Sequence, residues 1–204
     1  MGLESSPRGD APAQGKLLVA SAHLADPHFA RSVVLLLKHD PAAGAMGVIV
    51  NRPTSLRLGT LVPDLPGTAG VEHRLWRGGP VMPTAVIALV RSRDPLAGSE
   101  AVMDEVRVVT DRRAMVAALA GGLPAHRLRV FAGHAGWAPG QLEAELARGD
   151  WTVVQGTADT VFASRPDELW RRLGPRGLGE WTGHALRIAR PPCGESASLL
   201  RYGT

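Results

Sequence analysis

Cysteine is nearly missing from this sequence of 204 residues, in which Cys193 is the single example. One cysteine excludes a disulfide within the chain and any metal site built from several cysteines. Cys193 lies between prolines and a glycine near the C-terminus, where an incidental thiol is more common than a reactive one. We therefore expect the function to rest on other residue types.

Long hydrophobic runs are missing as well. Val33–Leu37 and the other apolar runs are far shorter than the roughly 20 residues that a helix needs to cross a bilayer. Residues 1–14 lack the basic and then apolar pattern of a signal peptide, and they are predicted to form a disordered tail. The sequence thus predicts a cytoplasmic protein with no membrane partner.

Lysine is scarce. Lys16 and Lys38 are the two examples, and arginine supplies the other 21 of the 23 basic residues. The isoelectric point is about 10.2, but the formal net charge is only +4. The arginines occur singly or in pairs along the chain rather than in one block. Non-specific binding to DNA or RNA needs clustered contacts to phosphates. Nucleic-acid binding is therefore not expected.

Common catalytic motifs are also lacking. The sequence contains no G-x-x-x-x-G-K-[ST] phosphate loop, no G-x-G-x-x-G dinucleotide turn, no G-x-S-x-G nucleophile elbow and no H-E-x-x-H metal helix. The seven histidines form no ligand pair at helical spacing, and a lone His134 at a strand end is more often packed than catalytic. We expect no metal and no cofactor, and a protein that acts by binding rather than as an enzyme.

Short β-branched and leucine-rich runs bounded by turn residues are plentiful, which is the pattern of strands. The predicted strands are Leu17–Ser21, Ser32–His39, Met46–Asn51, His73–Arg77, Thr84–Arg91, Val102–Val109, Leu128–Ala132, Thr152–Gln155 and Val161–Ala163. The predicted helices are Leu56–Leu61, Arg112–Ala120 with Asp111 as N-cap, Pro139–Arg148, and Pro166–Leu173 with Ser164 as N-cap. Strands in hairpin-like runs with helices between some of them favour an α+β fold with a mixed sheet. We expect one domain over residues 15–190, followed by a weakly ordered tail at 191–204.

In the segment FAGHAGWAPGQLEAELARGDW at 131–151, three glycines, Trp137 and Pro139 lead into a short helical run. Pro139 suits the first turn of a helix, and Gly149 suits its end. We interpret the glycine-rich part mainly as a packing turn from a strand into this helix.

The predicted helix places Gln141, Glu145 and Arg148 on a polar stripe beside its buried leucines. One interpretation is a surface ion pair between Glu145 and Arg148, worth a few tenths of a kcal/mol. The alternative is a polar row that lines a groove. Spacing alone favours the ion pair.

Four segments carry a resemblance to a known family: GKLLVASAHLADPHFARSVVLLLKHD at 15–40, GAMGVIVNRP at 44–53, RGGPV at 77–81 and GHAGWAPGQLEAEL at 133–146. In order and spacing they resemble the AlgH/YqgE family of bacterial proteins. The resemblance implies an α+β fold, a single domain with a mixed, strongly bent, pseudo-barrel-like β-sheet flanked by helices. It also implies a proposed role in transcriptional regulation, without an established biochemical activity. His28 and His134 stand where the family commonly has tyrosine, which argues against His134 as a general base.

Most residues of these segments have a structural interpretation. Asp26 and Pro27 are expected to turn the chain into Phe29, and Gly78, Gly79 and Pro80 to form a tight bend or bulge rather than a phosphate cradle. Gly136 and Trp137 are expected to anchor the loop on the sheet. These motif residues are Asp26, Pro27, Phe29, Gly78, Gly79, Pro80, Gly136 and Trp137.

Asn51 and Arg52 end a hydrophobic strand, where they either orient a ligand or satisfy buried backbone groups. The sequence favours a non-enzymatic regulatory or interaction protein with an unknown protein or small-molecule partner. The alternative is a small-ligand-binding protein or enzyme that uses a polar groove formed by Asn51, Arg52, Gln141 and Glu145. A direct DNA-binding regulator is the least favoured hypothesis.

Overall fold

The computed structural model describes residues 10–61 and 73–174 of the chain. The strands are β1 Lys16–Ala20, β2 Val33–Asp40, β3 Gly44–Ile49, β4 Pro53–Arg57, β5 Arg74–Arg77, β6 Val81–Arg91, β7 Ser99–Met103, β8 Val106–Val109, β9 Leu128–Trp137 and β10 Trp151–Gln155. The helices are α1 Leu58–Leu61, α2 Arg112–Ala120, α3 Gln141–Ala147, α4 Ala158–Val161 and α5 Pro166–Leu173.

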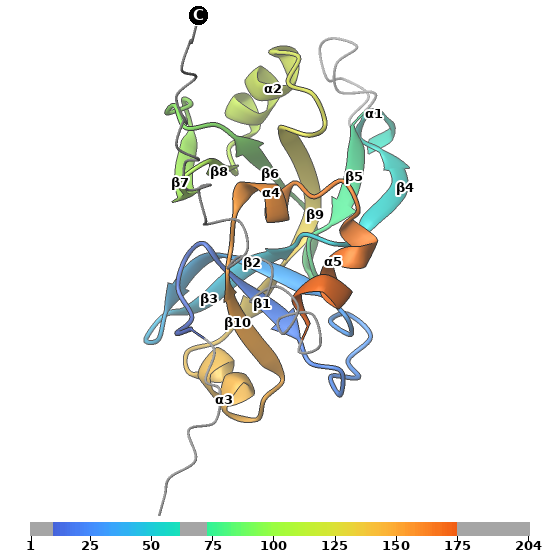
Figure 1. Ribbon diagram of the computed structural model, residues 1–204. Coiled ribbons are helices and arrows are strands. Elements are labelled where there is room, and N and C mark those ends of the chain that lie inside the picture. The colour runs from blue at the N-terminus through green and yellow to red at the C-terminus, as the bar shows by residue number, and fades with distance from the viewer. Residues whose placement is uncertain (1–9, 62–72, 175–204) are drawn as a thin grey trace, which may run out of the picture.

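All the strands belong to one strongly curled sheet, with the order β10-β1-β2-β3-β9-β6-β8-β7 (Figure 1). The strand β5 pairs with β4 and runs parallel to β9, whereas the other pairings are antiparallel. The strand β9 joins the two halves, because its first part pairs with β6 and β5 and its last three residues pair with β3. The predicted α+β class with a mixed, strongly bent sheet is confirmed.

Both faces of the central strands are buried, which explains their nearly continuous hydrophobic sequences. Successive residues of β2 point to opposite faces. Leu35 belongs to a core covered by α4 and α5, and Leu36 belongs to a core that also contains Leu142 of α3. A third cluster lies between α2 and the strands β6, β8 and β9.

The strand β9 is five residues longer than the sequence predicts, since it continues to Trp137 instead of ending at Ala132. The interpretation of Gly133 and Gly136 as part of a turn is wrong. A Cβ atom on Gly133 would lie 2.5 Å from the carbonyl oxygen of Gly79, and the φ angle of Gly133 is 69°. Glycine is needed here because two backbones approach closely inside the sheet.

Two helix predictions and one strand prediction also need correction. The helix α3 begins at Gln141 after Gly140 in left-handed conformation (φ 72°), so Pro139 precedes it. Gly149 follows the helix with φ 78°, as predicted. The predicted strand Val161–Ala163 is not formed. Val161 is the last residue of α4, whose N-cap is Thr157. Arg165, not Ser164, is the N-cap of α5.

The segment before the first gap also differs, because Pro53–Arg57 is a strand and only Leu58–Leu61 is helical. Of the predicted N-terminal tail, residues 10–14 are described, and Gln14 Nε2 donates a 2.7 Å hydrogen bond to the Ala101 carbonyl of β7. The predicted boundary at residue 190 and the tail at 191–204 lie outside the described residues.

Candidate functional site

Asn51 and Arg52 follow β3 and hold the loop before β2 in place. Asn51 is 7% exposed, and its Oδ1 accepts a hydrogen bond from the Val33 amide at 2.8 Å. Its Nδ2 donates to the carbonyl of Arg31 at 3.0 Å, while Arg52 Nη2 donates to the carbonyl of Ala30. Both side chains therefore satisfy backbone groups at the start of β2.

Glu145 of α3 is the acceptor for two indole groups. Its Oε2 lies 2.8 Å from Nε1 of Trp137 and 2.8 Å from Nε1 of Trp151. Its Oε1 accepts from Gln141 Nε2 at 2.9 Å. The expected pair between Glu145 and Arg148 is wrong, because Arg148 Nη2 lies 2.7 Å from Asp150. The carboxylate of Glu145 thus ties α3 to β9 and β10.

Phe29 lies against both tryptophans, with ring centroids 6.2 Å from Trp137 and 5.6 Å from Trp151. Trp137 is 6% exposed, so it is a packing residue of the core. The turn before Phe29 is held by Asp26, whose Oδ1 accepts from the His28 amide at 2.7 Å.

Within the described ranges, no hydrogen bond joins Asn51 or Arg52 to Gln141 or Glu145. A ligand groove lined by these four residues therefore stays a prediction.

Arg129, which the sequence analysis did not single out, is the most unusual polar residue of the described chain. It is 5% exposed and is the second residue of β9. Its Nη1 donates to the carbonyl of Val161 at 2.7 Å, and its Nη2 donates to the carbonyl of Ala163. The guanidinium lies 4.0 Å from the ring centre of Trp76 and 5.6 Å from that of Phe162. Its buried Nε has no hydrogen-bond partner.

No carboxylate among the described residues pairs with Arg129. Burial lowers the pKa of Arg129 to about 10, so the guanidinium remains protonated at neutral pH. Removing such a charge from water is costly, and proteins ordinarily offset the cost with an acidic partner. Here carbonyl oxygens and aromatic rings surround the cation and leave its charge unneutralised.

The side chain forms one wall of a cavity of about 290 Å³ between the start of β9, β5 and the connection from α4 to α5. The other polar lining residues are His73, Arg74, His126 and Ser164, and none of the residues lining it is acidic. Arg74, His126 and Ser164 are exposed and can donate hydrogen bonds to a ligand. Arg129 supplies a fixed positive charge behind them. We call this space the Arg129 cavity.

His73 contributes no charge to the Arg129 cavity at neutral pH. It is 5% exposed, and burial lowers the pKa of its imidazole in spite of hydrogen bonds to the backbone of Leu123 and Leu128. The neutral ring is held by those backbone groups, which leaves Arg74 and Arg129 as the fixed charges that a ligand would meet.

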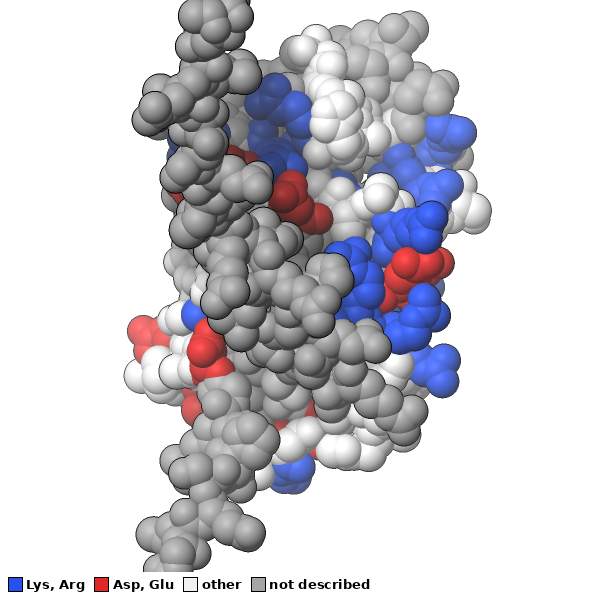
Figure 2. All heavy atoms as spheres, viewed as in Figure 1, with Lys and Arg blue, Asp and Glu red and all other residues white. Residues whose placement is uncertain are grey.

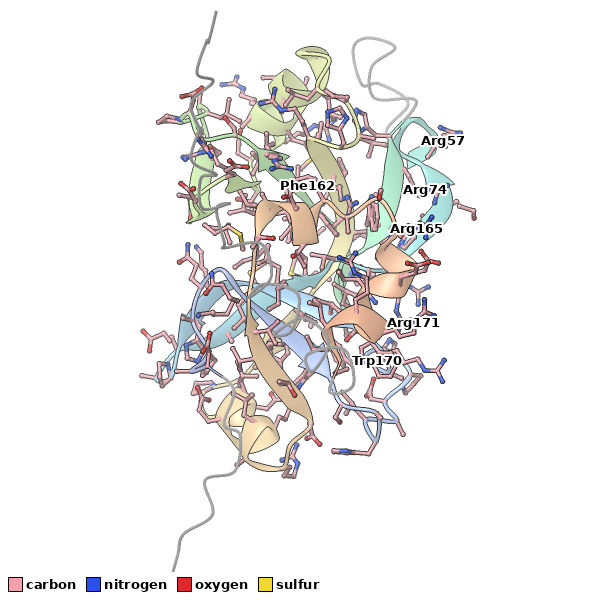
Figure 3. All side chains as sticks on the ribbon, viewed as in Figure 1. Arg57, Arg74, Phe162, Arg165, Trp170 and Arg171 are labelled. Atoms are coloured by element: carbon pink, nitrogen blue, oxygen red, sulfur yellow. The ribbon has the colours of Figure 1, made fainter. Side chains whose placement is uncertain are left out.

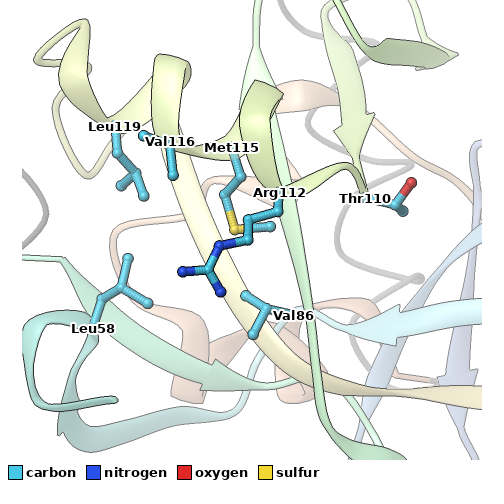
Figure 4. A pocket seen from close by; sticks show the side chains of 7 residues that line it. All are labelled: Leu58, Val86, Thr110, Arg112, Met115, Val116 and Leu119. Carbon is cyan, nitrogen blue, oxygen red and sulfur yellow. The ribbon is translucent and has the colours of Figure 1, made fainter. Parts of the chain in front are cut away.

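Neighbouring cavities differ in charge. One is lined by Arg91 and Arg93, but Glu105 accepts hydrogen bonds from both guanidinium groups. Another, of about 240 Å³, lies under α2 and is mainly apolar, with Arg112 among the residues that line it (Figure 4). The Arg129 cavity therefore combines a buried cation with exposed donors.

The alternation of side chains between the two faces of β9 was the sequence signal that could have indicated a buried Arg129. Leu128 and Val130 pack beneath α2, whereas Arg129 shares its face with Phe131, which is fully buried. A strand whose two faces are both apolar buries any arginine within it. The sequence does not show which carbonyl groups accept hydrogen bonds from the guanidinium or which aromatic rings lie against it.

Two further observations concern the described residues alone. None of their helices has the length and hydropathy needed to cross a membrane. No group of three or more His, Cys, Asp or Glu side chains is placed to hold a metal ion in this part of the chain.

The curled, ten-stranded mixed sheet with helices on its faces defines a single-domain α+β protein with a basic cavity beside its central strand. A family model described as AlgH-like (DUF179) matches residues 17–179. The chain therefore belongs to the AlgH-like family.

Proteins similar to this chain have been described in several bacteria. A UPF0301 protein of Streptomyces coelicolor is 40% identical over 171 residues, which cover 81% of this chain and 87% of the relative. The solution structure of the AlgH protein from Pseudomonas aeruginosa is similar with a TM-score of 0.66 and 28% identity, covering 96% of this chain and 100% of that one. A crystal structure of a Corynebacterium diphtheriae protein has a TM-score of 0.69 and 26% identity, covering 84% and 93% of the two chains.

Proposed function

We propose that this protein is a non-enzymatic regulator that binds a small anion in the Arg129 cavity. The observation that carries the proposal is the buried guanidinium of Arg129, which has an unpaired Nε and no acidic partner among the described residues. An anion in the cavity would offset this charge at short range, where the low dielectric strengthens the attraction. Phosphate and carboxylate groups are the chemical classes that arginine binds best.

The lining of the cavity supports binding rather than catalysis. Burial lowers the pKa of the His73 imidazole, which makes it a poor acceptor for a proton from a substrate. Among the described residues, no side chain that could act as a base forms a hydrogen bond with the hydroxyl of Ser164. The arrangement offers donors and positive charge, which hold an anion without a reacting group.

In this proposal the protein acts in the cytoplasm and passes the state of the cavity to a partner protein. Arg129 donates to the carbonyls of Val161 and Ala163, which lead directly into α5. An anion that binds the same guanidinium would compete with the carbonyls of Val161 and Ala163 and so weaken the attachment of the segment that leads into α5. Regulation of transcription would then be indirect, through the partner.

The test uses inorganic phosphate and the full chain. Phosphate is expected to raise the melting temperature in proportion to binding, because a ligand that binds only the folded state stabilises it by about 2.7 kcal/mol at 100 times Kd. Arg74→Ala is expected to weaken the effect, since Arg74 is an exposed donor of the cavity. Arg113→Ala, which removes an exposed arginine of α2, is the matched control. An equal response in both variants, or none in the native protein, contradicts the proposal.

A further inference from the structure

The mainly apolar cavity beneath α2 is enclosed by side chains from three elements. Leu58 begins α1, Val86 lies in β6, and Met115, Val116 and Leu119 project from α2. Leu58, Met115 and Leu119 are buried, and the two valines are half-buried. None of the described residues that line this cavity is acidic. We call it the α2 cavity.

The polar lining residues of the α2 cavity are Thr110 and Arg112, and both are exposed. In Figure 4 the side chain of Arg112 extends from the first residue of α2 toward the space between Leu58 and Val86. A hydroxyl and a guanidinium both donate hydrogen bonds, and the flat fork of the guanidinium matches the geometry of a carboxylate. The cavity therefore has an apolar interior and hydrogen-bond donors on its solvent side.

Several exposed arginines elsewhere in the described chain have an acidic neighbour. Figure 2 shows acidic side chains among the basic ones over α5. Arg165 and Arg171, labelled in Figure 3, lie 3.4 and 3.9 Å from the carboxylate of Glu168. Asp167 adds a second negative charge to the first turn of the same helix. The charges on that face are therefore mixed.

Arg112 differs from them, because it forms no hydrogen bond or ion pair with another described residue. The acidic residue next to it, Asp111, is the N-cap of α2, and its Oδ1 accepts a hydrogen bond from the Ala114 amide at 2.9 Å. Arg113, on its other side, carries a like charge and does not line the cavity. The guanidinium at the α2 cavity is therefore not bound to a carboxylate of the described chain.

The volume of the α2 cavity limits the size of a ligand. An apolar cavity of roughly 150 Å³ stays dry and binds benzene. A cavity of about 240 Å³ therefore has room for one such ring with a short chain attached. It is smaller than the roughly 300 Å³ at which pockets for drug-sized ligands begin. Burial of the ring would supply most of the affinity, and the chain would reach the donors on the solvent side.

We propose that the α2 cavity binds a small carboxylic acid with an apolar body about the size of one aromatic ring, whose carboxylate accepts hydrogen bonds from Arg112 and Thr110. One guanidinium and one hydroxyl match a singly charged carboxylate, whereas the three acceptor oxygens of a phosphate group need more donors. No residue lines both the α2 cavity and the Arg129 cavity. The inference therefore goes beyond the proposed anion site and does not depend on it.

The probes are 3-phenylpropionate and its uncharged amide, 3-phenylpropanamide, added to the full chain in a buffer without phosphate. The two share the apolar body, and the acid is expected to bind about tenfold more tightly because a charge-assisted hydrogen bond to arginine is stronger than a neutral one. Titration followed by backbone amide NMR signals gives both affinity and position. Shifts are expected at Met115, Val116 and Leu119, and not at Leu128 or Ala163 of the Arg129 cavity.

Arg112→Gln and Arg113→Gln remove the same charge from neighbouring exposed positions, of which only Arg112 lines the cavity. Arg112→Gln is expected to bind the acid about tenfold more weakly and the amide within about twofold of the native protein. Arg113→Gln is expected to keep both affinities. Val116→Phe places a ring in the cavity and is expected to abolish binding of both probes, whereas Ala117→Phe adds the ring at an exposed position and is expected to preserve it. Circular dichroism establishes that each variant is folded.

Failure of this inference is distinguishable from failure of the proposed function. Equal affinity for the acid and the amide in the native protein overturns the assignment of a carboxylic acid. An equal loss of acid binding in Arg112→Gln and Arg113→Gln reduces the effect to net charge and also overturns it. Shifts confined to residues of the Arg129 cavity overturn the second site and leave the proposed anion site standing. The response of the native protein and of Arg74→Ala to phosphate tests that anion site alone.

Discussion

The guanidinium of Arg129 lies 4.0 Å from the ring centre of Trp76, and the two residues are 5% and 8% exposed. A planar cation over an aromatic face is stabilised most when water is excluded. Lysine could not reproduce this arrangement, because it lacks the flat fork that stacks and donates at the same time. The pair places a permanent charge inside the protein without an acidic residue from the described chain.

Replacement of Arg129 by alanine is expected to destabilise the protein by about 3–5 kcal/mol, because it opens a void and leaves the carbonyls of Val161 and Ala163 unpaired. Arg129→Met is expected to cost less, since methionine fills much of the volume and removes a buried charge. Urea denaturation measures both losses. If Arg129→Ala is within about 1 kcal/mol of the native protein, the guanidinium is not the structural link described here.

Stability is expected to fall on acidification below about pH 6.5, partly through His73 and His134. Burial is the largest cause that lowers the pKa of each imidazole below the ordinary 6.5. Between the folded and the unfolded pKa the unfolded chain binds more protons, so stability decreases as pH falls and is constant above that window. Urea midpoints from pH 7.5 to pH 5 are expected to decline less steeply in His73→Gln and in His134→Gln. An unchanged slope in both variants would show that these histidines do not contribute.

Glu145 and Arg148 lie three residues apart but are expected to differ in their effect on stability. Glu145→Ala removes the acceptor of two part-buried indole groups, with an expected cost of roughly 1–3 kcal/mol for each unmade bond. Arg148→Ala breaks only an exposed pair with Asp150 and is expected to cost less than about 1 kcal/mol. Thermal unfolding and tryptophan fluorescence report both changes. Equal costs would contradict the assignment of Glu145 as a link between α3 and the tryptophans.

Gln141→Ala tests the predicted groove separately. Gln141 is exposed, so its loss is expected to leave the melting temperature almost unchanged. A small molecule or protein that co-purifies with the native chain but not with this variant would support a ligand groove at Asn51, Arg52, Gln141 and Glu145. Retention of every partner would move the working surface away from α3.

Two glycines with similar backbone angles are expected to respond differently to alanine. Gly133 and Gly122 have φ angles of 69° and 68°, so alanine suffers comparable backbone strain at both. A Cβ on Gly133 meets the Gly79 carbonyl oxygen at 2.5 Å, whereas one on Gly122 meets nothing within 4 Å. Gly122→Ala is expected to cost about 1 kcal/mol and Gly133→Ala several times more. Similar losses in urea denaturation would contradict the close approach of β9 to Gly79.

The strands were predictable where the hydrophobic pattern was strong and not where glycine interrupted it. Thr84–Arg91 lies within β6, and Leu128–Ala132 lies within β9. The last part of β9 was missed because Gly133 serves a backbone contact with Gly79, which is far from it in the sequence. A contact of that kind leaves no periodic trace in the sequence.

The candidate site was less predictable than the fold. The sequence left Asn51 with two possible roles, and the structure shows its hydrogen bonds to the backbone of Val33 and Arg31. The Arg129 cavity could not be found from spacing, since it forms between β5, β9 and the start of α5.

The pairing of β9 with three strands limits how its length can change. Its residues are in register with β6, β5 and β3 in turn, so one inserted residue would shift every later pair by one position. In a strand such a shift moves each side chain to the opposite face. An insertion ahead of β9 would turn the charge of Arg129 toward the cluster beneath α2. Natural variation in length should therefore collect in the loops, while the distance from Arg129 to Trp137 stays fixed at eight positions.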